Sequence, residues 1–417
     1  MVDDGVEVLV PPLHHQVVTA KIRLDAAPDA LRDAQAELER VLSELDAEFE
    51  PSPAGLGVTV AWGLPYFRRF VPEPADAHVP VDRRASEAEG GEMRVLLDAI
   101  RFPSDPEDTI LEDNEVAILL RSDNLDAIGA GAEALFGGEL PFLAATSIRK
   151  GFVGGGFEGG AGLPKQMALA AGVPGAELIP DGAELFLGFT SSQRAGLAPR
   201  GLVNFESLGI ADLSQSDYFR GGTNMHLSHL FEDLEAWYVD FDHAERVRTV
   251  FAPRLSVPRD RKTVRQAPQD VSTREDVASD FERFHVIGHS AAIQTTSRLA
   301  ADIRGPDGTL FRKGTAIPDR ADFNTLDNPF FWTAEPERDQ HSSEPAAGIH
   351  FLVFNPTSDD FHRNRLAMDG VLPDGTRLPF DPRARGQGFN SVLRTTHRQN
   401  FLVPPRRHRS FPLVELL

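Results

Sequence analysis

The most informative absence in this 417-residue sequence is cysteine, which does not occur at all. Disulfides, thiolate nucleophiles, zinc–thiolate sites, iron–sulfur clusters and cofactors attached through sulfur are therefore excluded. Uncharged apolar runs of about 18 residues are also absent, so no segment is expected to span a bilayer. The first ten residues, MVDDGVEVLV, are acidic and lack the basic start of a signal peptide, so a cytoplasmic location is expected.

Positive charge is in deficit as well, since 42 Lys and Arg residues stand against 63 Asp and Glu residues and leave a net charge of −21. A nucleic-acid backbone or an anionic membrane requires a positive protein face, so neither is expected as a partner. The hydrophobic content of 41% is ordinary for a folded protein and excludes wholesale disorder. At about 100–200 residues per domain, the length predicts two packed halves or one large domain.

The first half of the sequence has a strand–helix–strand pattern. Residues 15–24 (HQVVTAKIRL) alternate and are rich in β-branched side chains, which is typical of a strand. Residues 27–49 carry apolar side chains at helical spacing, with Pro28 in the first turn, where proline is tolerated. Further elements are predicted at 56–62 and 116–121 (strands) and at 124–136 (helix). Residues 71–92 are expected to form a surface loop, and the paired β–α units suggest a ferredoxin-like half.

The middle of the sequence is rich in glycine. Residues 151–162 (GFVGGGFEGGAG) hold seven glycines in twelve positions. A dinucleotide-binding loop requires GxGxxG between a strand and a helix, and no clear helix start follows here. A loop that lies against another backbone or a flat ligand is the preferred interpretation.

The second half repeats the strand–helix–strand order of the first. Strands are predicted at 222–231, 310–313 and 348–354, helices at 232–237 and 359–368, and long loops at 253–280 and 321–345. The expected organisation is an N-terminal half over 1–150, a glycine-rich connecting segment over 151–220 and a C-terminal half over 221–417.

Six segments between Pro11 and Phe361 occur in a recognisable order. They are PPLHHQVVTAKIRL, GVTVAWGLPYF, FRGGTNMHLSHLFEDLEAWY, VIGHSAAIQTTSRL, TLFRKG and AGIHFLVFNPTSDDF. Together they resemble the dye-decolorising peroxidase (DyP-type) superfamily of haem proteins. The resemblance implies an α+β fold of two ferredoxin-like halves with antiparallel sheets, in the dimeric α/β-barrel superfamily. It also implies haem b bound in the C-terminal half, next to a distal pocket supplied by residues 151–220.

His289 matches the axial haem ligand in this resemblance. The chemistry requires a neutral imidazole that faces an iron with an open coordination position opposite. The alternative is an ordinary core or capping histidine, and His285 competes for the role if the segment is helical. His226 and His229 are separated by an odd number of strand residues, so they are expected to face opposite sides and not to form a paired metal site.

Four further residues are candidates for the haem site. Arg312 matches the distal arginine, whose fixed guanidinium stabilises the negative charge that develops during peroxide cleavage; a surface arginine or a haem-propionate partner is the alternative. Asp359 or Asn355 is expected to accept a hydrogen bond from the other nitrogen of His289. Phe189 is expected to contact the haem.

The sequence departs from the family at the GxxDG motif, whose Asp moves the peroxide proton. In GFTSS (188–192) Ser191 replaces the Asp, and in GFEGG (156–160) a glycine stands there beside Glu158. Loss of a general base costs about 10²–10⁴-fold in rate. With only three Trp and three Tyr, few relay sites for long-range oxidation are present.

The expected function is thus a haem b protein that oxidises an unknown substrate weakly, with hydrogen peroxide and a small organic reductant as partners. Two alternatives stay open: a haem-binding protein without peroxidase turnover, and a relative that shares only the fold. Homo-oligomerisation is left open as well.

Overall fold

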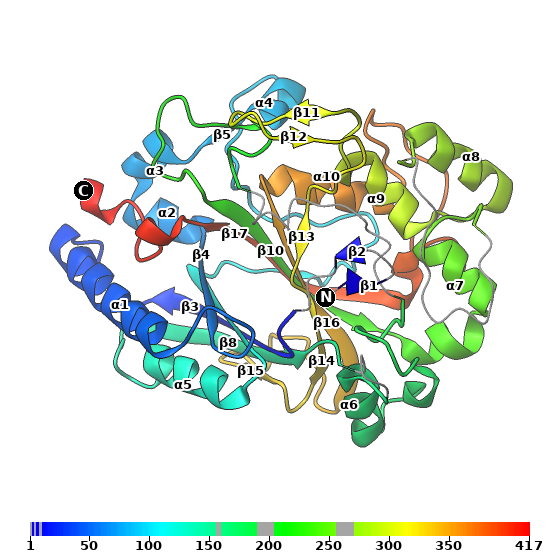
Figure 1. Cartoon of the computed structure of the whole chain (residues 1–417), viewed down its shortest axis with the longest axis horizontal. Helices are drawn as coiled ribbons and strands as arrows, with labels where there is room; N and C mark the ends of the chain where they lie inside the picture. The colour runs from blue at the N-terminus through cyan, green and yellow to red at the C-terminus, as the bar shows by residue number, and fades with distance from the viewer. Residues whose placement is uncertain (1, 4–5, 8–10, 156–159, 190–203, 256–270) are drawn as a thin grey trace.

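The computed structural model describes residues 2–3, 6–7, 11–155, 160–189, 204–255 and 271–417. It is a mixed α+β structure in which one large sheet runs through the centre and helices cover its outer faces (Figure 1). Among the described residues no helix has the length and apolar character needed to cross a membrane.

The N-terminal half is built on four long strands and two helices. In chain order these are β3 (His14–Ile22), α1 (Pro28–Glu48), β4 (Gly57–Gly63), β7 (Val116–Ser122), α5 (Leu125–Phe136) and β8 (Leu143–Phe152). The strands pair antiparallel in the order β8-β3-β7-β4. Numbered along the chain this is 4-1-3-2, the ferredoxin-like arrangement that the sequence predicts.

The C-terminal half has the same arrangement with more helices. Its main elements are β10 (Thr223–Glu232), the π-helix η2 (Ala236–Asp240), α7 (His243–Val250), α8 (Arg274–Phe284), α9 (His289–Ser297), β14 (Phe323–Asp327), β16 (Pro345–Asn355), α10 (Ser358–Met368) and β17 (Leu393–Val403). The strand order is β14-β16-β10-β17, and each pair is antiparallel. The two halves thus share one topology without a visible sequence repeat.

The two half-sheets join into a closed barrel. β8 pairs with β14 through Phe152 and Asn324, and β4 pairs with β17 through Trp62 and Leu402. Because β10 pairs with both β16 and β17, the path through the sheet returns to its start. The predicted fold class, two ferredoxin-like halves in a dimeric α/β-barrel arrangement, is confirmed.

The remaining helices and strands are shorter. They are β1 (Val2–Asp3), β2 (Val6–Glu7), α2 (Leu64–Phe70), α3 (Pro72–His78), β5 (Val81–Asp82), α4 (Arg83–Glu89), β6 (Ile110–Leu111), α6 (Leu163–Ala171), η1 (Ala176–Leu178), β9 (Ala211–Asp212), β11 (Ile303–Arg304), β12 (Leu310–Phe311), β13 (Asp319–Arg320), β15 (Phe331–Thr333), η3 (Phe389–Val392), η4 (Arg406–His408) and η5 (Val414–Leu416).

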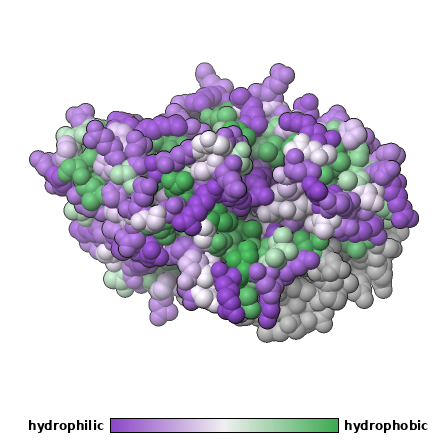
Figure 2. Space-filling view, turned by 90° about the horizontal axis from the view of Figure 1, so that it is seen from above, coloured by the Kyte–Doolittle hydropathy of each residue, from purple (hydrophilic) through white to green (hydrophobic). Residues whose placement is uncertain are grey.

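The apolar stripe of α1 explains how the N-terminal half is held together. Leu31, Leu38 and Leu45 are buried and pack in the largest core cluster with residues of the sheet, including Ile118 and Leu120 of β7. The exposed positions of the helix are mainly polar. Polar side chains also cover much of the molecular surface seen in Figure 2. The helix starts at Pro28, where the missing N–H costs nothing.

Two predicted loops were wrong. Residues 71–92 contain α3, β5 and α4, because Pro72 begins one helix and the Asp82 side chain caps the other by accepting from Ala85 N. Residues 321–345 contain β14 and β15, and β14 gives no alternating pattern because all five of its residues are buried.

A third predicted loop, 253–280, is partly helical. α8 starts at Arg274 with a capping box between Thr273 and Asp276. Residues 256–270 lie outside the described part of the chain.

Gly151 marks the seam between the two halves and generates a prediction. A Cβ at this position would lie 2.0 Å from the backbone oxygen of Asn324 in β14. We expect Gly151→Ala to force the strands apart and to lower the free energy of unfolding by about 2 kcal/mol or more, measured by urea denaturation. Gly91→Ala is the control, because nothing lies within 4 Å of its built Cβ. Equal stability of the two variants would contradict the close seam.

Candidate functional site

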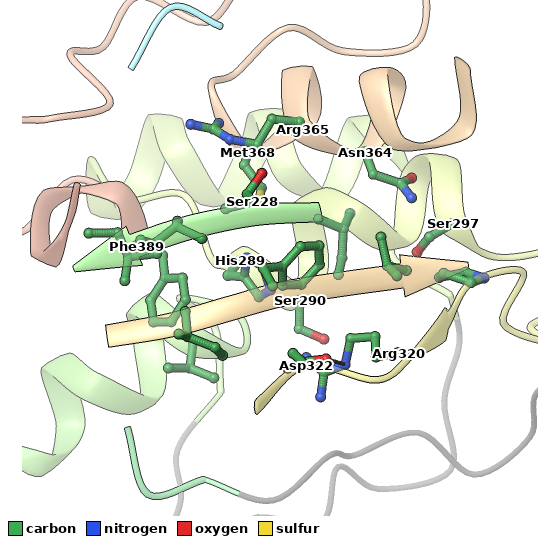
Figure 3. A pocket seen from close by; sticks show the side chains of 18 of the residues that line it. Ser228, His289, Ser290, Ser297, Arg320, Asp322, Asn364, Arg365, Met368 and Phe389 are labelled. Carbon is green, nitrogen blue, oxygen red and sulfur yellow. Dashed lines mark ion pairs between the residues drawn. The ribbon is translucent and has the colours of Figure 1, made fainter. Parts of the chain in front are cut away.

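A pocket of about 250 Å³ lies between one face of the C-terminal sheet and the helices that cover it (Figure 3). Its walls come from β10 and β16 on one side and from α9 and α10 on the other. Phe189, Phe251 and Phe389 add aromatic surface from three separate segments. The pocket is therefore a mainly apolar space with a few polar groups, the usual character of a cofactor site.

The alternation of side chains along β10 and β16 determines which residues of the sheet face the pocket. Ser228, Leu230 and Glu232 are two residues apart on β10, so their side chains share one face. Phe351 and Ile349 of β16 stand directly opposite Ser228 and Leu230 in the register and line the same pocket. The intervening residues of both strands face the barrel interior instead.

Helical spacing determines which residues of α10 line the opposite wall of the pocket. On α10, Phe361, Asn364, Arg365 and Met368 recur at three- and four-residue intervals and form one face towards the pocket. The Thr296 hydroxyl of α9 donates to Asn364 Oδ1 at 2.7 Å and fixes the two helices against each other.

His289 occupies the first position of α9 and lines the pocket. The preceding Gly288 lets the helix start approach another segment, since a Cβ there would lie 2.6 Å from the Phe251 oxygen. The Nδ1 atom of His289 is buried without a hydrogen-bond partner among the described residues. Burial, followed by the nearby Arg320 and Arg365, lowers the pKa of His289 to about 3. The ring is therefore neutral at ordinary pH, with a nitrogen lone pair available for a ligand.

The competing histidines are placed elsewhere. His285 ends α8 in the left-handed region, at φ 56°, so it does not share a helix face with His289. His226 stacks on Phe361, with ring centroids 3.4 Å apart, whereas His229 is bonded to Asp327 in the barrel interior. The two strand histidines thus have separate surroundings, as their odd spacing suggests.

Arg312, the sequence candidate for the distal arginine, lies outside the pocket. Its side chain is 73% exposed, and its Nη1 donates to Asp302 at 2.7 Å. It follows the short strand β12, which pairs only with β11 in a two-stranded hairpin on the surface. This assignment therefore needs correction: a surface ion pair, not the pocket, holds the Arg312 guanidinium.

Asp359 also has a different partner from the one expected. Its carboxylate accepts from Arg84 Nη2 at 3.3 Å, and burial raises the pKa of Asp359. Neither Asp359 nor Asn355 lines the pocket, and no hydrogen bond to His289 is found from either. The expected acid partner of His289 is thus not present among the described residues.

The remaining sequence candidates divide into two groups. Phe189 does line the pocket and contacts Trp237 and Phe251 with ring centroids 6.4 and 5.3 Å apart. Ser191 lies outside the described residues, as do Glu158 and most of the GFEGG segment.

Sequence reasoning missed a charged group at the pocket. Arg320, at the end of β13, and Asp322, just before β14, both line the pocket, with Arg320 Nε 3.6 Å from Asp322 Oδ1. In the view of Figure 3 they lie on one side of His289, and Arg365 lies on the other. Asp322 lies within the predicted loop 321–345 and Arg320 directly precedes it, so neither residue was weighed as part of a site.

The arginines and Glu232 complete the polar lining. Arg365 and Arg398 share Asp105 at 3.4 and 2.6 Å, and Arg298 donates to the Gly314 carbonyl. Glu232 is buried, its Oε2 has no hydrogen-bond partner among the described residues, and burial together with Asp322 raises its pKa to about 8. Near neutral pH the pocket thus contains a protonated carboxylic acid beside an arginine–aspartate pair.

A family model described as a family of unknown function, DUF7405, matches residues 12–405, so the chain belongs to that family. A comparison with curated proteins gives no match.

Among solved structures, the chain is similar to a dye-decolorizing protein from V. cholerae, with 13% identity, 97% of each chain covered and a TM-score of 0.53. It is similarly close to a putative DyP-type peroxidase from Shewanella oneidensis, with 13% identity, 98% of this chain and 96% of that chain covered and a TM-score of 0.55. A variant of DypB from Rhodococcus jostii RHA1, in complex with heme, has 11% identity, 97% and 96% coverage and a TM-score of 0.55. The chain therefore has the DyP-type fold in a divergent branch.

Glu232 generates a prediction about pH. Burial raises the pKa of Glu232 to about 8 in the folded protein, whereas an unperturbed glutamate carboxyl has a pKa of 4.5. Between these values the folded state binds more protons than the unfolded state, so the free energy of unfolding falls as pH rises. Glu232→Gln should remove this component, which is on the order of a few kcal/mol. Urea denaturation near pH 5 and near pH 8 measures it.

Glu235→Gln is the matched control, because Glu235 is exposed three residues further along the chain. It should keep the pH dependence of the unmodified protein. An unchanged pH dependence in Glu232→Gln would show that Glu232 is ionised in the folded state near neutrality.

Proposed function

We propose that this protein binds haem b in the pocket between β10, β16, α9 and α10, with His289 as the axial ligand. The observation that carries the proposal is the neutral, buried imidazole of His289, which lines an apolar pocket and has an unpartnered ring nitrogen. Imidazole is a usual axial ligand of haem iron. The fold similarity to haem-containing DyP-type proteins supports the same conclusion.

The rest of the pocket fits this group chemically. Apolar side chains from both walls, including Leu230, Ile293 and Phe351, suit a flat hydrophobic macrocycle. Arg298 and Arg365 provide guanidinium groups for carboxylate side chains of the cofactor.

We further propose a weak peroxide-dependent oxidation at this site, with a small organic reductant as the electron donor. Bound haem would supply the redox chemistry for peroxide cleavage. Arg320 would stabilise the negative charge that develops on the leaving oxygen, Asp322 would accept the peroxide proton, and the protonated Glu232 would donate one. These residues take over the roles that the sequence assigns to Arg312 and Ser191.

The environment of His289 favours slow turnover. A carboxylate bonded to the second nitrogen makes an axial histidine more basic. Such a partner is missing among the described residues, because Asp359 is paired with Arg84. A less basic ligand donates less electron density to the iron, so binding of haem without rapid peroxide cleavage is the second candidate function.

The axial assignment is tested by reconstituting the full-length protein with haem and recording absorption spectra. We expect a Soret band at one haem per chain for the unmodified protein and loss of that band in His289→Ala. His285→Asn is the control, since asparagine tolerates the left-handed conformation at that position. Full haem binding by His289→Ala would contradict the ligand assignment. Absence of haem binding by the unmodified protein and by both variants would contradict the proposal that this protein binds haem.

The distal assignment is tested by comparing two arginine variants. Arg320→Leu should lower kcat/KM for peroxide by about 10²–10³-fold, the usual cost of losing one electrostatic donor. Arg312→Leu should leave the rate unchanged, because Arg312 is exposed outside the pocket. Both variants are compared at equal Soret absorbance, which separates a loss of rate from a loss of haem. A larger loss in Arg312→Leu than in Arg320→Leu would reverse the assignment.

A further inference from the structure

A second group of histidines lies on the opposite face of the same sheet. His229 on β10 stands directly opposite His397 on β17. His341, from the loop between β15 and β16, lies beside both, with ring centroids 4.5 Å from His229 and 4.8 Å from His397. One ring nitrogen from each of the three lies within 4.8 Å of the others. We call these three residues the histidine triad.

Hydrogen bonds orient two rings of the histidine triad in the same way. The Nε2 atoms of His229 and His397 lie 2.8 Å from Asp327 Oδ1 and 3.4 Å from Asp339 Oδ1. An ionised carboxylate can accept hydrogen bonds but cannot donate one, so each ring carries its proton on Nε2. Each Nδ1 is then an acceptor with a free lone pair.

These acceptors outnumber the hydrogens available to them. Both Nδ1 atoms converge on the Thr396 hydroxyl, at 2.5 Å for His229 and 2.8 Å for His397, and this hydroxyl has a single hydrogen. His341 has both ring nitrogens buried without a hydrogen-bond partner among the described residues. Unsatisfied buried acceptors cost free energy, and a cation would satisfy all three at once.

Charge in the surroundings also favours a dication. Asp327 is fully buried, Asp339 is nearly so, and Glu112 neutralises the buried Arg149 next to them. These four charged side chains carry a net charge of −2.

We propose that the histidine triad binds a divalent transition-metal ion such as Zn²⁺, with Asp327 and Asp339 as the carboxylates that orient the ligands. Three imidazoles with a hydrogen-bonded carboxylate behind a ring nitrogen are a usual donor set for zinc, copper, nickel or iron. Metal–nitrogen distances of about 2.0–2.1 Å require the rings to move together by small side-chain rotations. The Thr396 hydroxyl then turns away from the two Nδ1 atoms.

Access to the site is provided by the β15–β16 loop. This loop carries both His341 and Asp339, and the Asp339 side chain is 14% exposed. His341 also stacks on Phe331, with ring centroids 3.2 Å apart and planes inclined by 6°. His341 lies on a surface loop, whereas His229 and His397 lie on strands of the sheet. Movement of the loop would therefore allow a metal ion to enter from solvent.

The experiment uses the untagged, full-length protein after treatment with a chelator. Co²⁺ is added first, because tetrahedral nitrogen coordination gives intense visible bands, and Zn²⁺ binding is then measured by calorimetry. We expect one ion per chain, cobalt bands that Zn²⁺ displaces, and a higher thermal midpoint with metal.

Two variants at one position separate ligation from folding. His341→Ala and His341→Phe should both lose at least about 100-fold in metal affinity, while His341→Phe keeps a ring against Phe331. His408→Ala is the control, because His408 stacks on Tyr218 and is not one of the three grouped histidines. Absence of binding by the unmodified protein, or unchanged affinity in His341→Phe, would overturn the proposal. His289→Ala should bind metal normally, so this outcome does not depend on haem.

Discussion

The structure depends on the pairing of β10 with strands on both of its sides. This strand joins β16 and β17, and without it the sheet would have two open edges in place of a closed barrel. The barrel interior covers one face of β10 and the helices α9 and α10 lie over the other, so most of its side chains are buried. Ser228 and His229, adjacent in sequence, therefore belong to two different interiors. The positions of the pocket and of the histidine triad follow from this alternation.

A register shift in the β10–β17 pair changes which side chains of β17 lie opposite those of β10. His229 pairs with His397 but Leu230 pairs with Thr395, so Thr396 is an extra residue on β17. This is the geometry of a β-bulge, which re-aims side chains next to it. Here the bulged Thr396 turns its hydroxyl towards the two neighbouring histidines. The same shift leaves Arg398 on the pocket side, where it bonds Asp105.

Much of the fold could be predicted from the sequence, because the long elements have clear periodicity. The helix over 27–49 and the strands over 15–24 and 348–354 are observed within a few residues. Strands buried on both faces, such as β14, lack alternation and were missed for that reason.

The site was less predictable. His289 lines the pocket, as its motif indicates. Arg312 was expected there as well, but the short segment TLFRKG does not indicate whether its strand belongs to the central sheet or to a separate hairpin. The triad was invisible to sequence reasoning. His229 and His397 lie on strands that are distant in the sequence and pair only in the folded C-terminal half-sheet, and His341 lies in a loop between two other strands.

The two faces of the C-terminal sheet differ in the charge they can accommodate. On the pocket side, Arg298 offers a positive charge to a ligand, which suits a cofactor with carboxylate groups, whereas Arg320 is paired with Asp322. On the interior side, Asp327 and Asp339 place negative charge beside the histidines, which suits a cation. A buried charge costs free energy, and a ligand of opposite sign offsets that cost. The two proposed ligands therefore differ in charge in the same sense as the two faces of the sheet.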